Sequence, residues 1–319
     1  MQGLALLLLA TLQLVQLVQP LPLTIIHQPN HALHAPPPGT PHAERPDRLD
    51  AIMDELTSSN LGATIITSSN PLARVESAIN ATHSSYYLKN LRKTVGGLNS
   101  DTYVAPGSYR TILTATSCWL SALDLASSYS GPAFALTRPP GHHATKEAGM
   151  GFCLVNFCAC SALEFLKENE NKRVAVLDID VHFGNGSADI LKGLKRARFA
   201  SVHERGIYPG SGESKAEGEN VLKLPVPSGC LGPEWLEHVN QALEFVLADD
   251  PDLLIVSVGY DALSEDPLAG LNLTPDNYAE AIGLITGRFP KSRTFFGLEG
   301  GYALSATATA VRKSCEALM

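Results

Sequence analysis

Short apolar runs alternate with longer amphipathic stretches along most of this chain. The short runs are rich in β-branched residues, which is typical of buried strands. Continuous apolar runs of this kind predict a parallel sheet that is covered on both faces. The expected strands are Leu23–His27, Ala133–Thr137, Val174–Asp180, Phe199–His203, Leu253–Gly259 and Thr294–Gly300.

Between these runs, the apolar residues recur with helical spacing. Two of the predicted helices open with a proline at or near the first turn, where a backbone N–H is not needed. The expected helices are Tyr109–Tyr129, Leu154–Asn169, Pro233–Ala248 and Pro275–Arg288. Strands that alternate with helices predict an α/β fold built from βαβ units. Because no repeat or linker divides the chain, we expect one domain over residues 23–319.

The first 22 residues differ from the rest. Residues 3–18 are almost wholly apolar, and the first charged side chain is Glu44. The apolar stretch is shorter than the roughly 20 residues of a spanning helix, so we expect no stable membrane span in the mature chain. It lacks the positive start and clear cleavage site of a signal peptide. A leader to an organelle or secretory space and an N-terminus outside the core of a cytoplasmic protein both remain open.

Composition narrows the functional classes. With 319 residues, 45% hydrophobic and 18% charged, the chain is neither collagen-like, disordered nor a polytopic membrane protein. The net charge of -8 offers no basic surface for nucleic acid, so direct binding to nucleic acid is not expected. The six cysteines lack zinc-finger spacing and are expected to be buried thiols without disulfides.

Metal-binding and proton-transferring side chains follow four of the predicted strands. They are His142 and His143 after the second strand, Asp178, Asp180 and His182 at the end of the third, Asp261 after the fifth, and Tyr302 after the sixth. Open parallel sheets bind ligands outside the carboxyl ends of their strands. We therefore expect these residues to form a single site.

The spacing of three of these residues indicates a catalytic metal. Asp180 and His182 are two residues apart on an extended segment, so both can bind one ion, and Asp261 supplies a third ligand. Three ligands with open positions are typical of catalytic zinc, and ferrous iron also fits. Asp178 is expected to orient a ligand or a neighbouring imidazole.

Two further features are compatible with catalysis but less specific. Of the adjacent pair His142 and His143, one neutral imidazole can take a proton from water while the other stays charged, although a polar loop or a second metal site would use the same residues. Tyr302 follows Gly300 and Gly301, an elbow that could aim its hydroxyl at an oxyanion. A tyrosine in the core is the alternative.

Eight distinctive sequence blocks occur along the chain: PHAERPDRL, DTYVAPGSY, RPPGHHA, GFCLVN, DIDVHFGNG, YPGSG, SVGYDALSEDPLAGL and LEGGY. Together they resemble the histone deacetylase and acetylpolyamine amidohydrolase family. The resemblance extends from about Leu23 to the C-terminus. Asn185 makes it closer to class II and bacterial members than to class I. It implies an arginase-like three-layer α/β fold with a mainly parallel eight-stranded sheet.

The resemblance also implies the chemistry. It implies one zinc ion bound by Asp180, His182 and Asp261, and hydrolysis of acetyl-lysine in proteins. The implied catalytic residues are His143 as general base, His142 as an electrostatic partner steadied by Asp178, Tyr302 as oxyanion donor, and Asn185. The implied structural potassium ion would be held by Asp178, Asp180, His182, Ser201 and Val202.

The same resemblance implies how substrate is held. Gly151, Phe152 and Phe183 would form the walls of an acyl-lysine tunnel, and Asp101 would hold the peptide backbone at the rim. Phe183, Phe157 and Val155 depart from common family residues, which leaves the tunnel shape and acyl preference open. Leu268 stands where polyamine-specific members have an acidic residue, so an acetylated protein or peptide is the expected substrate.

Three alternatives remain. Acetylpolyamine hydrolysis would use the same site. An acyl-lysine binding module would need a broken catalytic set, but every expected catalytic residue is present. A di-manganese ureohydrolase would need further carboxylates, and Asn185 and the histidine pair disfavour it.

Overall fold

The computed structural model describes residues 22–213 and 218–319. An eight-stranded sheet crosses its centre in the order β2-β1-β5-β10-β9-β6-β7-β8, and every strand pairing in it is parallel. The strands are β1 (Thr24–His27), β2 (Thr64–Thr67), β5 (Ala133–Leu136), β6 (Val174–Asp178), β7 (Ala197–Glu204), β8 (Val221–Val226), β9 (Leu253–Val258) and β10 (Thr294–Leu298). The predicted α/β architecture with an eight-stranded parallel sheet is confirmed.

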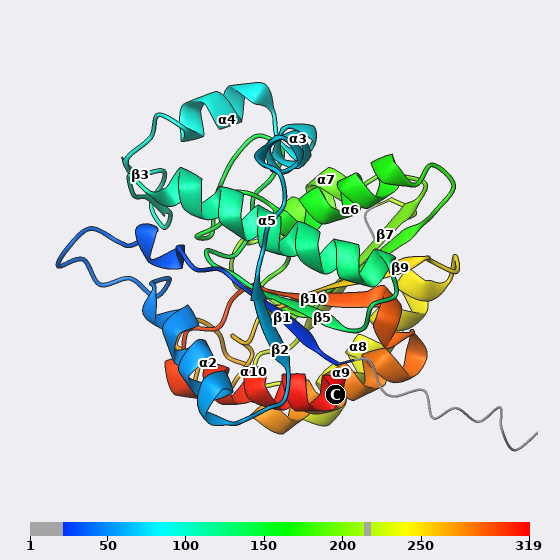
Figure 1. The fold of residues 1–319 in the computed structure, drawn as a ribbon. Coiled ribbons are helices and arrows are strands. Elements are labelled where there is room, and N and C mark those ends of the chain that lie inside the picture. The colour runs from blue at the N-terminus through cyan, green and yellow to red at the C-terminus, as the bar shows by residue number, and fades with distance from the viewer. Residues whose placement is uncertain (1–21, 214–217) are drawn as a thin grey trace, which may run out of the picture.

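Helices cover both faces of the sheet, as Figure 1 shows. One layer contains α3 (Leu72–Thr82), α4 (Ser85–Leu91), α5 (Ser108–Ser127), α6 (Phe157–Glu168) and α7 (Asn185–Leu191). The other contains α2 (Asp47–Ser58), α8 (Gly232–Leu247), α9 (Pro275–Arg288) and α10 (Leu304–Leu318). Short 3-10 helices lie between β1 and α2 (η1, His31–Leu33) and between α9 and β10 (η2, Lys291–Arg293). All four helices expected from the sequence are present.

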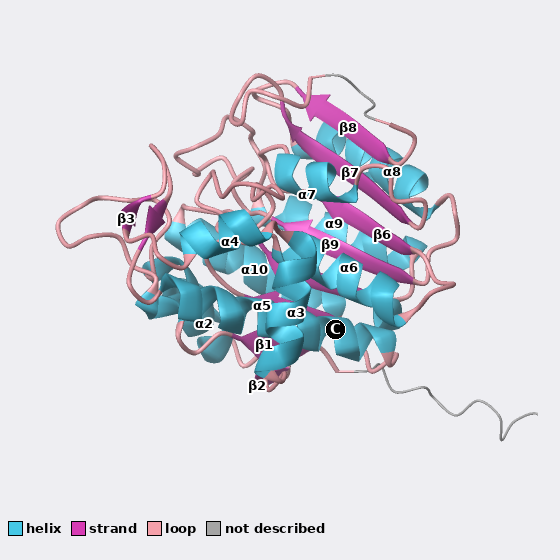
Figure 2. Cartoon of the chain, turned by 90° about the horizontal axis from the view of Figure 1, so that it is seen from above, coloured by secondary structure: helices cyan, strands magenta, loops and turns pink. Residues whose placement is uncertain are grey.

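The sheet separates two hydrophobic cores, and successive residues of a strand enter opposite cores. In β9, Leu254 and Val256 pack with α8, α9 and α10, whereas Ile255 packs with α5 and α6. This two-sided burial explains the continuous apolar runs, because neither face of a central strand is exposed to water. Figure 2 shows the strands lying between the two helical layers.

A small antiparallel hairpin lies beside the main sheet. It pairs β3 (Gly96–Gly97) with β4 (Tyr103–Val104), and its connecting turn contains Asp101. Figure 2 shows this hairpin projecting from one end of the molecule. It brings the turn to the rim of the pocket described below.

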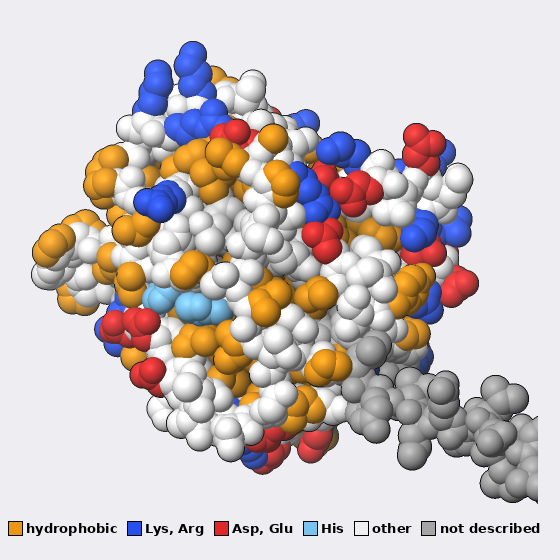
Figure 3. Space-filling view, in the orientation of Figure 1, with side chains coloured by type: hydrophobic (Ala, Val, Ile, Leu, Met, Phe, Trp, Pro, Cys, Tyr) orange, Lys and Arg blue, Asp and Glu red, His pale blue; other side chains and the backbone are white. Residues whose placement is uncertain are grey.

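The described residues also bear on other predictions. All six cysteines are buried and free, as expected. Within residues 22–213 and 218–319, no helix combines the length and apolar character that a membrane crossing requires. The face in Figure 3 carries small groups of basic and acidic side chains separated by uncharged ones. The predicted leader, residues 1–22, lies outside the described residues except for its last residue.

Candidate active site

A cavity of about 180 Å³ opens at the carboxyl ends of the central strands. It is lined by Asp101, His142, His143, Gly151, Phe152, His182, Tyr208, Leu268 and Tyr302. The expected chemistry follows β5, β6, β9 and β10, which are consecutive in the sheet order. Chain segments more than a hundred residues apart therefore meet at one point.

Three buried candidate ligands converge beside this cavity. Asp180, His182 and Asp261 each offer one ligand atom, and these atoms lie within 4.8 Å of one another. His182 Nδ1 is 3.2 Å from Asp180 Oδ1 and 3.1 Å from Asp261 Oδ2. Asp261 follows β9, which pairs with β6, so the expected neighbouring-strand arrangement is present.

The surroundings of these ligands fit a divalent ion. Backbone N–H groups of Gly300 and Val181 donate to Asp180 Oδ2 and Asp261 Oδ1 at 2.9 and 3.0 Å, which fixes both carboxylates. A Cβ at Gly259 or Gly300 would collide with these carboxylates, so glycine is needed at both positions. Two carboxylates and one imidazole are a donor set that zinc or ferrous iron accepts, and the fixed outer contacts orient the ligands.

The two adjacent histidines have different partners. His142 Nδ1 lies 3.0 Å from Asp178 Oδ2, whereas His143 Nδ1 lies 2.7 Å from the amide oxygen of Asn185. Their ring centroids are 4.0 Å apart. Asp178 thus contacts an imidazole, as the sequence predicted, and Asn185 faces the second imidazole at the start of α7.

These partners separate the protonation of the two rings. Burial opposes the charged form of His142, but the negative charges of Asp180 and Asp178 outweigh it and raise the pKa of His142 well above its usual value. Burial, together with the charges of His142 and His182, lowers the pKa of His143 well below the usual value. His143 is therefore a neutral proton acceptor beside a charged neighbour.

Sequence reasoning did not single out Glu299, which supports the histidine loop from β10. Its carboxylate accepts hydrogen bonds from the backbone N–H groups of Gly141 and His142, at 2.6 and 3.1 Å, and from the Ser257 hydroxyl at 3.0 Å. Burial raises the pKa of Glu299 to about 7. The only sequence signal was its place in the LEGGY block.

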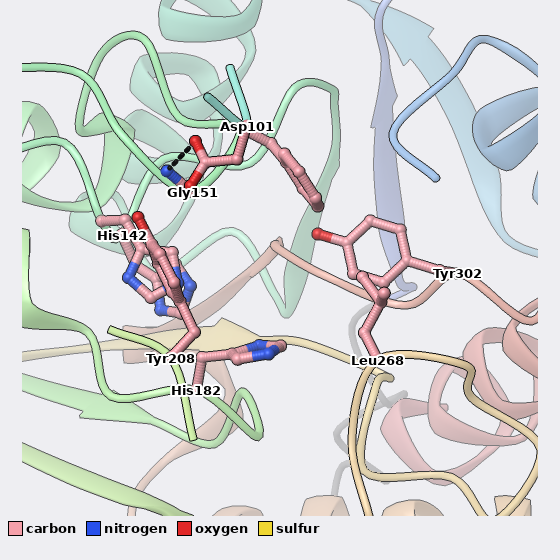
Figure 4. Close-up of a pocket in the computed structure, with 9 residues that line it drawn as sticks. Asp101, His142, Gly151, His182, Tyr208, Leu268 and Tyr302 are labelled. Carbon is pink, nitrogen blue, oxygen red and sulfur yellow. Dashed lines mark hydrogen bonds between the residues drawn. The ribbon is translucent and has the colours of Figure 1, made fainter. Parts of the chain in front are cut away.

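The opposite side of the cavity carries Tyr302. Figure 4 shows its hydroxyl directed into the cavity, across from His142 and Tyr208. Burial raises the pKa of Tyr302 well above its usual value, although the nearby Arg48 charge lowers it, so the hydroxyl keeps its proton. Arg48 lies 4.6 Å from the centroid of the Tyr302 ring. It donates to the carbonyl oxygens of Gly301 and Glu299 at 2.7 and 2.6 Å.

At the rim, the hairpin turn is tied to the wall of the cavity. Asp101 Oδ1 accepts from the Gly151 N–H at 3.2 Å, drawn as a dashed line in Figure 4. The Thr102 hydroxyl accepts from the Phe152 N–H at 3.0 Å. Leu268 also lines the rim, and 39% of it is exposed.

One expected wall residue lies elsewhere. Phe183 is 3% exposed and packs 4.9 Å from the His203 ring, outside the cavity lining. Tyr208 takes the expected place, with its ring 5.0 Å from that of His143. The DIDVHFGNG segment turns into α7 soon after Phe183, whereas Tyr208 of the YPGSG block lines the cavity. The tyrosine in that block was the available signal.

Three of the residues expected around potassium lie next to one another in neighbouring strands. Asp178 and Ser201 are register partners in β6 and β7, and Val202 follows Ser201. Ser201 Oγ is 3.0 Å from His203 Nδ1.

Comparison with known protein families shows to which family this chain belongs. The model of the histone deacetylase domain matches residues 42–318. This chain belongs to that family. An uncharacterized protein of Synechocystis is 37% identical over 293 residues, covering 88% of this chain and 95% of that protein. Histone deacetylase 14, chloroplastic, of Arabidopsis thaliana is 33% identical over 310 residues, covering 87% of this chain and 73% of that protein.

Solved structures agree with this assignment. The HDA15 HD domain matches with a TM-score of 0.85 and 27% identity, covering 93% of this chain and 89% of that one. An acetylpolyamine aminohydrolase from Burkholderia pseudomallei shares the fold, with a TM-score of 0.80, 24% identity, and coverage of 93% and 98%. The protein is thus a histone deacetylase-family hydrolase with a buried Asp-His-Asp candidate metal site.

Proposed function

We propose that this protein is a zinc-dependent deacetylase that removes acetyl groups from lysine side chains of proteins. The observation that carries the proposal is the convergence of the ligand cluster, the histidine pair and Tyr302 on one narrow cavity. The cavity could receive an extended acyl-lysine side chain end-on, with the amide near the ligands.

The chain's own residues would divide the work of amide hydrolysis. Zinc held by Asp180, His182 and Asp261 would polarise the acyl carbonyl and acidify water. His143, neutral and fixed by Asn185, would accept the proton of the attacking water and pass it to the leaving amine. Charged His142, held by Asp178, would stabilise the negative charge that develops on the substrate during hydrolysis. The Tyr302 hydroxyl would donate to the oxyanion, a contact whose loss typically costs about 2.7–4 kcal/mol of barrier.

Further residues would bind substrate or support the site. Gly151, Phe152 and Tyr208 would enclose the lysine stem, and Asp101 would accept from the peptide backbone. A potassium ion would bind the side chains of Asp178 and Ser201 and the main-chain oxygens of Asp180, His182 and Val202. The pairing of Asp178 in β6 with Ser201 in β7 supports this second ion site.

The rim favours acyl-lysine over an acetylated polyamine. A polyamine carries a distant ammonium that an acidic residue at the mouth would attract. Leu268 is uncharged and exposed at this position. An exposed leucine is better suited to apolar contact with a peptide substrate than to binding an ammonium group.

Turnover of an acetyl-lysine peptide beside acetylspermidine and acetylputrescine tests the proposal, with zinc-loaded protein. We expect peptide turnover, and its collapse in Tyr302→Phe and His143→Ala. Leu268→Glu should raise kcat/KM for the polyamines relative to the peptide. Preference of the unaltered protein for a polyamine would overturn the substrate assignment, and no turnover of any of the three would overturn acetyl hydrolysis.

A further inference from the structure

One buried carboxylate joins the rim of the cavity to the tyrosine elbow. Asp266 lies in the loop after β9 and is 6% exposed. Its Oδ1 accepts from the Leu268 N–H at 3.0 Å. Its Oδ2 accepts from the N–H groups of Tyr302 at 2.7 Å and Ala303 at 3.3 Å.

These contacts reach two residues that line the cavity. Leu268 and Tyr302 come from different loops, yet Figure 4 shows them together on one side of the cavity. Each is held through its backbone N–H by a different oxygen of the same carboxylate. A shift of Asp266 would therefore move the rim side chain and the tyrosine hydroxyl together.

The elbow needs this support at Tyr302 because its other hydrogen bonds, such as that from the Gly300 N–H to Asp180 Oδ2, lie before this residue. Arg48 donates to the carbonyl oxygens of Glu299 and Gly301, on the side preceding Tyr302. Gly301 has a φ of +119°, a backbone conformation that glycine adopts more readily than other residues because it has no Cβ. Asp266 fixes the N–H groups that follow, where α10 begins.

We propose that Asp266 is a positioning residue that sets the place of the Tyr302 hydroxyl and, through the same carboxylate, the place of Leu268 at the rim. This inference rests on the proposed deacetylase function. It makes Asp266 responsible for two separable effects, on the chemical step through Tyr302 and on substrate binding through Leu268.

A double-mutant cycle between Asp266→Asn and Tyr302→Phe tests this role on an acetyl-lysine peptide. Asparagine keeps the size of the side chain but replaces one acceptor oxygen by a donor, and repulsion between this donor and the facing N–H shifts the side chain away from both of its contacts. We expect Asp266→Asn alone to lower kcat about 10-fold, part of the roughly 10²–10³ that an oxyanion donor supplies. In the Tyr302→Phe background it should leave kcat unchanged and still raise KM by about 3-fold, because Leu268 is still released.

Equal fractional losses of kcat in both backgrounds would overturn the proposal, since a merely structural defect acts independently of the tyrosine hydroxyl. Glu265→Gln is the matched control, because it neutralises the exposed carboxylate next in the chain and should change neither constant. Asp266→Glu is the second variant; it keeps the charge but displaces the oxygens, and should show the same dependence on Tyr302.

A crystal structure of zinc-loaded Asp266→Asn separates this proposal from the deacetylase function. We expect Tyr302 and Leu268 to leave the positions they occupy in the unaltered protein. Unchanged positions of both would overturn the proposal, whether or not any acetylated compound is turned over. Failure of the unaltered protein on every acetylated substrate would instead overturn the function alone.

Discussion

Asn185 accepts a hydrogen bond from His143, so this one side chain can influence proton transfer in the proposed reaction. Asn185 Oδ1 is uncharged, so it orients the imidazole through Nδ1 without adding the charge that would raise its pKa. Asp178, in contrast, is a carboxylate whose charge helps to raise the pKa of His142. The choice between amide and carboxylate at these two positions keeps one ring neutral and the other charged.

Removal of the Asn185 side chain should therefore lower the catalytic rate more than the free energy of unfolding. We expect Asn185→Ala to reduce kcat/KM about 10-fold, a fraction of the roughly 10²–10⁴ that a general base contributes. Steady-state kinetics on an acetyl-lysine peptide measure the loss. Asn185→Asp keeps an oxygen that orients the ring but adds a negative charge, which should raise the pKa of His143 and move the acidic limb of its kcat/KM profile to higher pH; an unshifted limb would contradict the role of the uncharged amide.

For single residues, the sequence predicted which side chains belong to the site better than it predicted where those side chains point. Asp178 and the three candidate metal ligands lie where spacing along the chain placed them, because neighbouring parallel strands bring their ends together. Spacing could not show that the ring of Phe183 turns away and that of Tyr208 lines the cavity. That choice depends on how two loops fold after the strands end.

Between elements, buried charge connects α2 to the catalytic edge of the sheet. Glu44 is fully buried and accepts from Arg138 Nε at 2.8 Å and Nη2 at 2.6 Å. It also pairs with Arg48 at 3.4 Å, the residue that holds the elbow before Tyr302. Loss of one carboxylate would leave two buried guanidinium groups without this partner.

We expect Glu44→Gln to lower the free energy of unfolding by about 3–5 kcal/mol at pH 7, because it uncouples a buried ion pair. Urea unfolding followed by circular dichroism measures this value. Asp47→Asn is the control: Asp47 is more than half exposed and its pair with Arg45 should contribute less than about 1 kcal/mol. A loss for Glu44→Gln no larger than for the control would refute the prediction.

Acid should remove the same stabilisation. Burial alone would raise the pKa of Glu44, but Arg138 and its other partners hold it well below the usual value. A carboxylate with a lowered folded pKa stabilises the fold above its unfolded pKa of about 4.3, and this contribution is lost as the pH falls towards the folded pKa. The difference between the unaltered protein and Glu44→Gln should thus narrow in unfolding measurements below about pH 4.

Within the main sheet, strand prediction failed at the two edges, and among the described helices α2, α3, α4, α7 and α10 were not expected either. The missed strands β2 and β8 are its outermost members. All four residues of β2 are exposed, so it lacks the buried apolar pattern of the central strands. Pro225 and Lys223 interrupt β8, and proline within a run argues against a strand except at an edge. Central strands are recognisable because burial on both faces restricts their composition.

Across the whole molecule, a metal ion would connect two central strands. Asp180 and His182 follow β6, and Asp261 follows β9. Any ligand that binds only the folded state stabilises it, by about 2.7 kcal/mol at 100 times its Kd. Metal binding should therefore strengthen the middle of the sheet as well as support catalysis.

We expect a chelator to lower the Tm of the zinc-loaded protein, and Asp261→Ala to abolish both stoichiometric zinc and this response. Calorimetry and elemental analysis measure the two effects. Asp250→Asn, which neutralises an exposed carboxylate, should retain one zinc and the same Tm shift. One equivalent of zinc on Asp261→Ala would show that the ligand set is wrong.

We expect the cysteines of the native protein to resist alkylation, because all six thiols are buried. Thiolate is the reactive form, and burial raises the pKa of every one of these cysteines. Iodoacetamide should modify each site only as fast as the surrounding structure opens. Cys118 and Cys315 lie in the cores on opposite faces of the sheet. Mass spectrometry of their labelling would thus follow the opening of the two helical layers separately, without any introduced probe.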